Sequence, residues 1–289
     1  MAERRSGRIL AVESSCDETA VAVVDGGRRI LANVVASQTS LHAPTGGIVP
    51  EVAARAHLRW MLPVLDEARR QAELRDWSSI EAVAVTYGPG LAGSLLVGIA
   101  MAKTLAWLHE LPLVPVNHHE GHIYAAWLLD PGETERPAPA FPLVALVVSG
   151  GHTLLVEMPD ALRYRLLGQT VDDAAGEAFD KVGRLLGLPY PGGPAIMRAA
   201  ADARRRDRVL PRAWMGDSYD FSFSGLKTAV RRIVTDEVGG TADDGLDRRP
   251  SVQLTRSPRR VHQRERLDEL AGCGVPRVPA GGVGTEPQL

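Results

Sequence analysis

Three histidines and one glutamate stand close together in the stretch NHHEGHIYAAWLL, residues 117–129, whose apolar part is typical of a helix. His118 and His122 are four residues apart, so on a helix both imidazoles project from the same face. That spacing suits two nitrogen ligands on one metal ion, with other positions left for a carboxylate, water or substrate. Glu120 is not placed as in HExxH, the zinc-protease pattern whose glutamate activates a metal-bound water. The alternative is a polar helix start whose histidines only cap the helix or contact backbone.

Two glycine-rich stretches further along the chain are candidates for holding an anion. VVSGGHT, residues 147–153, lies between two expected strands, and its paired glycines expose backbone N–H groups beside the hydroxyl of Ser149. PGGP, residues 191–194, precedes an expected helix, and a helix N-terminus favours negative charge. In both places an ordinary glycine turn is the alternative.

Acidic side chains gather in DDAAGEAFDK, residues 172–181, where Asp173, Glu177 and Asp180 fall within two turns of one expected helix. Mainly alanine and glycine separate these acids, so a ligand could approach the helix closely. Asp180 could then accept hydrogen bonds from a ribose or another hydroxylated group. A solvated acidic face is the alternative.

Two further stretches combine hydroxyl groups with charge. ESSCDET, residues 13–19, could hold a phosphate through backbone groups and its serine and threonine hydroxyls, or could be a simple turn between two strands. FSFSGLKT, residues 221–228, could stack a base and contact a phosphate through Lys227. Core packing of Phe221 and Phe223 is the alternative there, and Ser222 or Ser224 could cap the helix that follows.

The elements that must position these groups follow a similar order in each half of the chain. Each half begins with three short strands and continues with helices, which indicates an α/β class. Two such halves facing each other across a cleft would suit nucleotide binding at their interface. The expected strands are 8–15, 20–26, 28–37, 80–88, 111–117, two within 142–158, and 163–170; the expected helices are 50–74, 88–110, 118–129, 172–188, 191–206 and 221–238.

We expect an N-terminal α/β lobe at residues 1–117 and a second, incomplete α/β lobe at 118–238. The segment 130–142 is rich in proline and charge, so the domain junction is expected there or slightly before it. Residues 239–289 are expected to be a poorly structured tail. From Thr241 onward the sequence holds no Phe, Trp or Tyr, and prolines interrupt every pattern.

Composition narrows the class of protein. The 289 residues carry a formal net charge of -2, which argues against a globally basic nucleic-acid binder but not against a local basic patch. Only three lysines occur, Lys103, Lys181 and Lys227. Cys16 and Cys273 are far apart, as is typical of a reducing compartment, and no apolar run is long enough for a signal peptide or a membrane span. We therefore expect a soluble, cytoplasmic protein with no membrane partner.

Taken together, the motifs resemble one family over residues 8–236. They follow the order found in the bacterial TsaD proteins, also known as Gcp or YgjD, which are tRNA N6-adenosine threonylcarbamoyltransferases. The resemblance implies a two-lobed actin/Hsp70/sugar-kinase-like (ASKHA) α/β fold with a central cleft. The stretches that carry it are ILAVESSCDETAVAVVD, GGIVPEVAARAH, TYGPGLAGSLLVG, NHHEGHIYAA, VSGGHT, DDAAGEAFDKVGRLLGLPYPGGP and FSFSGLKTAV.

The resemblance also implies an activity, a metal and partners. The expected reaction transfers a threonylcarbamoyl group from threonylcarbamoyl-adenylate to N6 of the adenosine 3′ of the tRNA anticodon. Iron or zinc would lie on His118 and His122. The expected partners are tRNA, the smaller TsaB-like relative and the TsaE-like ATPase, with a TsaC-like enzyme supplying the adenylate. The implied substrate-binding residues are Val147, Val148, Ser149, Gly150, Gly151, Asp180 and Gly193.

The C-terminal stretch departs from the family pattern. Family members continue with a GGV-A-N motif and then a CTDNA-like motif whose aspartate completes the metal site. Here RVPAGGVGTEPQL keeps residues 281–283 of the first motif, Glu286 stands where the asparagine would fall, and no CTDNA follows. We interpret this as a truncated or frameshifted C-terminus that lacks the third protein ligand. Two alternatives stay open: a catalytically incompetent relative acting only as a binding partner, and a metalloprotease of the O-sialoglycoprotein endopeptidase type.

Overall fold

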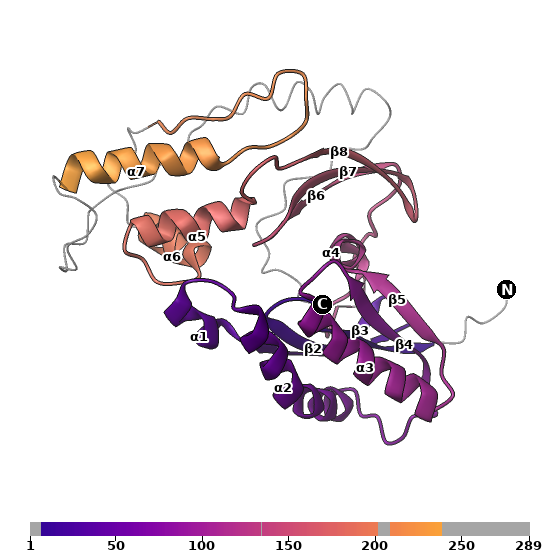
Figure 1. Ribbon diagram of the computed structural model, residues 1–289. Coiled ribbons are helices and arrows are strands. Elements are labelled where there is room, and N and C mark those ends of the chain that lie inside the picture. The colour runs from indigo at the N-terminus through magenta and orange to yellow at the C-terminus, as the bar shows by residue number, and fades with distance from the viewer. Residues whose placement is uncertain (1–6, 134, 202–208, 239–289) are drawn as a thin grey trace. The chain divides into compact units, whose positions relative to one another are not determined.

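The chain divides into two compact units on either side of the bond between Pro139 and Ala140. The computed structural model describes residues 7–133, 135–201 and 209–238 (Figure 1). Each unit combines a β-sheet with helices, so the expected α/β class is confirmed. The division falls inside the proline-rich segment 130–142 rather than at residue 118, and the histidine helix therefore belongs to the first unit. The expected tail at 239–289 lies outside the described residues.

The first unit is built on a five-stranded sheet in the order β3-β2-β1-β4-β5. Its first three strands form the expected antiparallel meander, whereas β4 pairs parallel to β1 and β5 parallel to β4. The carboxyl ends of β1, β4 and β5 therefore meet at one edge of the sheet, which is where ligands commonly bind in such folds. The strands are β1 (Arg8–Glu13), β2 (Glu18–Asp25), β3 (Arg29–Ser37), β4 (Ile80–Gly88) and β5 (Leu113–Asn117).

Two long helices pack on this sheet, α2 (Pro50–Gln71) and α3 (Ala92–Leu108). Pro50 occupies the first turn of α2, where its missing N–H costs no hydrogen bond. Short helical turns complete the unit: α1 (Thr39–His42), η1 (Ala43–Thr45), α4 (His118–Tyr124) and η2 (Ala125–Trp127). The core between sheet and helices is made of buried aliphatic side chains, among them Leu10, Val12, Val21, Val23, Met61, Val64, Leu65, Val83 and Leu105.

The second unit has an antiparallel sheet of β6 (Leu143–Val148), β7 (Thr153–Asp160) and β8 (Arg163–Gln169). Three helices follow: α5 (Ala175–Leu185), α6 (Gly192–Ala201) and α7 (Ser224–Val238). The strands and helices predicted for this part of the chain are confirmed, except that residues 202–206 of the expected helix 191–206 lie outside the described residues. One detail differs, because α5 begins at Ala175 and Asp173 therefore precedes the helix. A small core of Val182, Leu186, Ile196 and Val230 joins the three helices.

Across the described ranges, no helix combines the length and the apolar character that a membrane crossing requires.

Candidate functional site

The two histidines of the NHHEGH stretch converge at the start of α4. Asn117 caps this helix, since its side-chain oxygen accepts a hydrogen bond from the backbone N–H of His119 at 2.9 Å. The Nε2 atoms of His118 and His122 are 3.0 Å apart, and the two rings stand nearly perpendicular at 84°. The prediction that both imidazoles share one helix face is confirmed.

Glu13, at the end of β1, lies behind His118. Its Oε2 is 3.4 Å from the Nδ1 of His118, and the same Nδ1 is 3.2 Å from the hydroxyl of Ser15. Burial tends to raise the pKa of Glu13, but hydrogen bonds with His118, Ser15 and Thr86 outweigh it and lower the pKa below its ordinary value. An ionised carboxylate beside Nδ1 favours the tautomer with its proton there, which leaves the lone pair of Nε2 directed toward His122.

This arrangement fits two ligands of one metal ion. Imidazole nitrogens bind zinc at roughly 2.0–2.1 Å, so two of them on one tetrahedral ion lie about 3.3 Å apart. The 3.0 Å separation of the two Nε2 atoms is close to that value. A carboxylate that accepts the other ring N–H is the usual support of a metal-binding histidine. Within the described residues, however, no third His, Cys, Asp or Glu joins the pair in a metal-binding group.

The turn that carries Glu13 and Ser15 is packed tightly on the start of α3. The hydroxyl of Ser14 donates to the carbonyl of Ser94 at 2.8 Å and accepts from the N–H of Gly98 at 3.1 Å. A Cβ at Gly98 would lie 2.4 Å from that hydroxyl oxygen, so only glycine allows this approach. The hydroxyl of Ser14 is thus used inside the fold, which supports the turn interpretation of ESSCDET for this residue.

A buried polar network adjoins the same turn, and no sequence motif predicts it. Thr19 donates to the Nδ1 of His57 at 2.7 Å, and the Nε2 of His57 lies 3.1 Å from the carbonyl of Cys16. His42 joins through Gln38, whose side-chain oxygen is 3.2 Å from the Nε2 of His42. Burial lowers the pKa of His57 despite its bond to Cys16, so the ring is held neutral with its proton on Nε2.

Cys16 itself is not a nucleophile in this setting. Burial, reinforced by the carboxylate of Asp17, raises the pKa of its thiol to about 12. A thiol is reactive as the thiolate, which is scarce at neutral pH for such a group.

In the second unit, the SGG turn between β6 and β7 rests on the start of α5. The N–H of Gly176 donates to the carbonyl of Ser149 at 3.2 Å, and a Cβ at Gly176 would lie 2.6 Å from that oxygen. Thr153 ties the same region together by accepting from the N–H of Ala175 at 2.9 Å. The two glycines of the turn, residues 150 and 151, are exposed. Both glycines therefore lie at the surface of this unit.

The two valines before this turn differ in their surroundings. Val147 is buried, whereas Val148 is 47% exposed and lies next to the turn. The side chain of Val147 therefore contributes to the packing of β6.

Asp180 holds the second glycine turn. Its Oδ1 accepts a hydrogen bond from the N–H of Gly192 at 2.7 Å, at the first residue of α6. A Cβ at Gly192 would lie 2.6 Å from the Cα of Asp180, so backbone approaches backbone here. Gly176 and Asp180 are four residues apart on α5, which places the two turns about 6 Å apart along one helix. The structure thus brings together Ser149, Gly150, Gly151, Asp180 and Gly193 within one unit.

The prediction that α5 is thin enough for a ligand to approach is corrected in one respect. The small residues of its thin side, Gly176 and Gly183, are covered by backbone of the chain itself, at Ser149–Gly150 and at Gly192. The acids before and on this helix also have structural partners. Asp173 and Glu177 both bind Lys181, at 2.6 and 2.8 Å.

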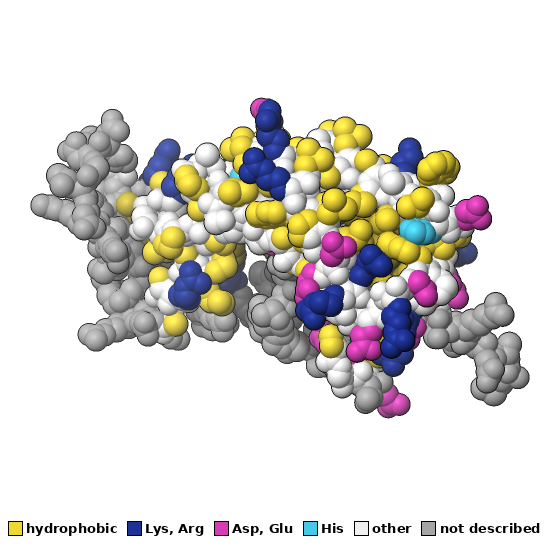
Figure 2. Space-filling view, turned by 90° about the horizontal axis from the view of Figure 1, so that it is seen from below, with side chains coloured by type: hydrophobic (Ala, Val, Ile, Leu, Met, Phe, Trp, Pro, Cys, Tyr) yellow, Lys and Arg dark blue, Asp and Glu magenta, His cyan; other side chains and the backbone are white. Residues whose placement is uncertain are grey.

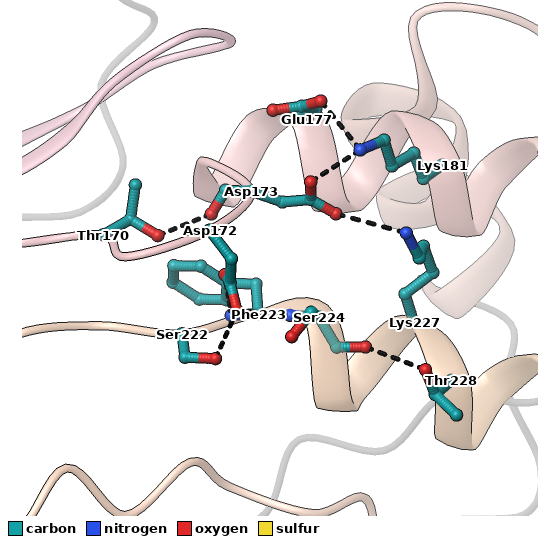
Figure 3. A network of polar contacts seen from close by, with 10 residues as sticks. All are labelled: Thr170, Asp172, Asp173, Glu177, Lys181, Ser222, Phe223, Ser224, Lys227 and Thr228. Atoms are coloured by element: carbon teal, nitrogen blue, oxygen red, sulfur yellow. Dashed lines mark hydrogen bonds and ion pairs between the residues drawn. The ribbon is translucent and has the colours of Figure 1, made fainter.

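Figure 3 shows how the FSFSGLKT stretch is anchored. Asp172 accepts hydrogen bonds from the N–H groups of Phe223 at 2.8 Å and Ser224 at 3.3 Å, and from the hydroxyl of Ser222. The cap of α7 is therefore Asp172, from 52 residues away, rather than Ser222 or Ser224. Desolvation opposes the shift, but these bonds lower the pKa of Asp172 to about 2. Lys227 lies 3.6 Å from the Oδ2 of Asp173.

Comparison with known proteins adds a family to this geometry. A family model described as TsaD, tRNA N6-adenosine threonylcarbamoyltransferase, matches residues 29–262. A protein of that name from Thermomicrobium roseum is 62% identical over 226 residues, which are 78% of this chain and 62% of the relative. Another from Symbiobacterium thermophilum is 56% identical over 228 residues, 79% of this chain and 65% of the relative. The chain thus spans less than two thirds of the length of these two relatives.

Among solved structures, a Pseudomonas aeruginosa protein described as similar to peptidase YeaZ aligns with 55% of this chain and 63% of its own. The identity is 17% and the TM-score 0.36, a likeness too slight to support an argument. The family match and the sequence identities are decisive by themselves. On these grounds the chain belongs to the TsaD family of tRNA N6-adenosine threonylcarbamoyltransferases.

Proposed function

We propose that this chain transfers a threonylcarbamoyl group from threonylcarbamoyl-adenylate to N6 of the adenosine 3′ of the tRNA anticodon. The observation that carries the proposal is the family match over residues 29–262, together with 62% identity to a relative of that name. The match includes both the histidine pair and the glycine turns whose geometry is described above.

The donor would bind on the face of α5 that carries the two glycine turns. Gly150 and Gly151 are exposed, and their turn would suit the phosphate of an adenylate, since successive backbone N–H donors in a turn attract anions. Asp180 holds the turn that presents Gly193 through its bond to Gly192, and it lies one helical turn from Gly176. Asp180 therefore fixes the distance between the two turns, whichever part of threonylcarbamoyl-adenylate each turn contacts.

His118 and His122 would hold a divalent iron or zinc ion, as the 3.0 Å separation of their Nε2 atoms allows. When bound, such an ion supplies a Lewis acid that polarises a carbonyl or neutralises phosphate charge. The protein's own contribution is orientation. Glu13 and Ser15 hold the Nδ1 side of His118, and Asn117 fixes the start of the helix that carries both rings.

The chemistry of the two substrates explains what the site must do. The exocyclic amine of adenosine is a weak nucleophile, whereas the donor is a mixed anhydride with AMP as a good leaving group. Holding amine and anhydride in reacting geometry therefore supplies much of the rate, because it replaces a bimolecular encounter. We assign no side chain as the acceptor of the amine proton.

The proposed partners are tRNA, a TsaB-like protein and a TsaE-like ATPase, and the proposed location is the cytoplasm. The first unit presents a surface suited to a protein partner. Leu58 and Leu62 on α2 and Leu96 on α3 are each at least 60% exposed. In the view from below, Figure 2 shows hydrophobic side chains gathered on this side of the molecule. The two helices touch where Gly93 faces Ala54, which is one helical turn from Leu58 on α2 and from Leu96 on α3.

The proposal is tested by reconstitution. The purified chain is incubated with unmodified tRNA, TsaB-, TsaC- and TsaE-like proteins, threonine, bicarbonate and ATP, and the nucleosides are analysed by mass spectrometry. We expect threonylcarbamoyladenosine, with the Thermomicrobium roseum relative as positive control. Product from the relative but none from this chain would overturn the proposed activity and leave the binding-partner alternative. Stoichiometric iron or zinc in the purified chain is expected as well.

A further inference from the structure

The turn between β1 and β2 is held through three consecutive backbone carbonyls, each by a different segment of the chain. The carbonyl of Ser15 accepts a hydrogen bond at 2.7 Å from the N–H of Leu91, just before α3. The carbonyl of Asp17 accepts one at 2.9 Å from the N–H of Gln38, just after β3. The carbonyl between them, that of Cys16, is held by a side chain of α2.

This side chain is His57, which is fully buried. Its Nε2 lies 3.1 Å from the carbonyl oxygen of Cys16, and the hydroxyl of Ser94 is a more distant donor to the same oxygen at 3.4 Å. On the other side of the ring, Nδ1 accepts from the hydroxyl of Thr19 at 2.7 Å. Both ring nitrogens therefore have a partner, which fixes the orientation of the imidazole between α2 and the sheet.

We propose that His57 is a positioning residue for the histidine pair. By holding the carbonyl of Cys16, it sets the turn whose side chains support His118. The proposal deepens the function proposed above and rests on it for the metal ion that the pair would hold. His57 acts through the turn and is not itself a ligand.

The path from His57 to His118 is short. The hydroxyl of Ser15 lies 3.2 Å from the Nδ1 of His118, and the carboxylate of Glu13 lies 3.4 Å from the same atom. The N–H of Ser15 also donates to the carboxylate of Glu13, so the two groups are tied to each other. Cys16 follows Ser15 directly, and a shift of its carbonyl therefore moves the backbone that carries both contacts. Ligands of a metal ion must be held to within about 0.5 Å, so such a shift weakens the site.

Packing alone does not account for an imidazole at this position. Among the buried residues of α2, a helix that the structure describes throughout, His57 alone is polar. An apolar side chain would fill the space at a lower desolvation cost, whereas the imidazole adds a directed hydrogen bond to the carbonyl of Cys16. Burial lowers the pKa of His57, which keeps the ring neutral, and the bond from Thr19 to Nδ1 leaves the single proton on Nε2.

The first test measures the zinc affinity of the metal-free full chain by competition with a chromophoric chelator. His57→Leu removes both hydrogen bonds, and we expect zinc affinity to fall about 10-fold, as when a group that supports a metal ligand is lost. His57→Gln keeps an N–H at a similar reach and is expected to bind zinc as the wild type does. Val64→Ala, two turns further along the buried side of α2, leaves a cavity in the same helix but should keep wild-type affinity.

A comparison in a second background asks whether His57 acts through the turn. A chain that carries both Glu13→Gln and Ser15→Ala lacks the two groups that the turn presents to His118. Adding His57→Leu to that chain should cost much less zinc affinity than adding it to the wild type, because coupled residues are not additive. Equal losses in the two backgrounds would overturn the proposal. So would equal zinc affinities of the wild type and His57→Leu, or an equal loss in Val64→Ala.

A second readout does not require a metal ion. Nitrogen-15 NMR of the histidine-labelled chain under mildly alkaline conditions reports the tautomer of His118, whose signals are assigned by their loss in His118→Ala. We expect the proton on Nδ1 in the wild type and in Val64→Ala, and a mixture of both tautomers in His57→Leu. Unchanged His118 signals in His57→Leu would overturn the proposal, whether or not the chain binds zinc.

Failure of this inference and failure of the proposed function are distinguishable. If the reconstituted system yields threonylcarbamoyladenosine but His57→Leu keeps the zinc affinity and the His118 tautomer of the wild type, only the positioning role is wrong. If His57→Leu changes the tautomer of His118 while the wild type gives no product, the positioning role stands and the proposed transferase activity is wrong.

Discussion

At the residue scale, the histidine pair depends on a group that sequence spacing did not reveal. Helical periodicity is enough to place His118 and His122 on one face, and that prediction is confirmed. The orientation of His118 comes from Glu13, which is 105 residues away in the chain. Glu13 and His118 lie close together because β1, β4 and β5 are parallel and their carboxyl ends share one edge of the sheet. A single sequence does not state that register, so it indicates Glu13 only as part of an acidic turn.

Replacing Glu13 by Gln tests this dependence. The change keeps the size of the side chain but removes the charge that favours a proton on the Nδ1 of His118. We expect iron or zinc affinity to fall about 10- to 100-fold, the usual effect of losing such a supporting group. His118→Ala and His122→Ala are expected to abolish metal retention altogether. Metal bound after dialysis is measured by plasma mass spectrometry.

His109→Ala is the matched control, because this histidine stacks on Trp77 and lies outside the pair. It should retain metal as the wild type does. Wild-type metal content in either His118→Ala or His122→Ala would show that the substituted histidine is not a ligand.

A second prediction at this scale concerns the glycines of the SGG turn and α5. Gly176→Ala would place a Cβ 2.6 Å from the carbonyl of Ser149, so the turn or the helix must shift. Such overpacking costs about 1–3 kcal/mol of unfolding free energy. Gly150→Ala meets nothing within 4 Å and is expected to fold as the wild type does. Urea denaturation of both variants measures the difference in the free energy of unfolding. Equal values would mean that the turn or the helix shifts without loss of stability.

At the element scale, strands and helices could be predicted from patterns within one segment, whereas the contacts that anchor them to distant segments could not. The meander of β1 to β3 and the amphipathic helix α2 follow from alternation and helical spacing within one segment, and both are confirmed. The cap of α7 was expected from Ser222 or Ser224, because hydroxyl groups near a helix start usually serve this role. Asp172 caps the helix instead. The segment after β8 lies beside the FSF stretch, because Thr170 forms a β-bridge with Phe221, and this brings Asp172 to the N–H of Phe223.

Asp172→Asn tests this anchor through its pH dependence. The pKa of Asp172 is lowered from 3.8 to about 2, so its ionised form stabilises the folded state. That contribution is complete above about pH 4 and is lost as the pH falls through about 2. Because the side chain is exposed, we expect the substitution to cost about 1 kcal/mol or less near neutral pH. The free energy of unfolding is measured by urea denaturation from pH 7 to pH 2.

The difference between wild type and Asp172→Asn should shrink across the interval from pH 4 to pH 2, because protonation removes the same charge in the wild type. Asp236→Asn, near the other end of α7, provides the control and should follow the wild type throughout. A constant difference between Asp172→Asn and the wild type over the whole range would contradict the anchoring role.

At the scale of the whole molecule, the chain has the actin/Hsp70/sugar-kinase-like α/β class that membership of the TsaD family implies. Composition and the order of elements predicted two α/β halves without the family. The boundary between the two halves was harder to place. Helix α4 follows β5 without a break, and because β5 pairs with β4, α4 stays in the first unit. The division at Pro139 instead follows the loss of regular pattern in the proline-rich segment.

The exposed apolar face of α2 and α3 leads to a prediction about assembly. Leu62 is 60% exposed in the middle of α2, a position where an isolated soluble unit gains nothing from leucine. Leu62→Asp would place a charge beside these exposed leucines and should reduce binding of the proposed TsaB-like partner at least 10-fold, the effect of burying an unpaired charge. Met197→Asp makes the same kind of change at a 66% exposed position on α6 of the second unit and should bind normally.

Sedimentation velocity of each variant mixed with the TsaB-like protein measures the fraction in complex. Both substitutions add one negative charge at an exposed helix position, so general effects of charge or solubility cancel between them. Complex formation lost in Leu62→Asp and kept in Met197→Asp would place the interface on the first unit. If Met197→Asp lost the complex instead, the partner would contact the second unit, and the leucines of α2 and α3 would need another occupant.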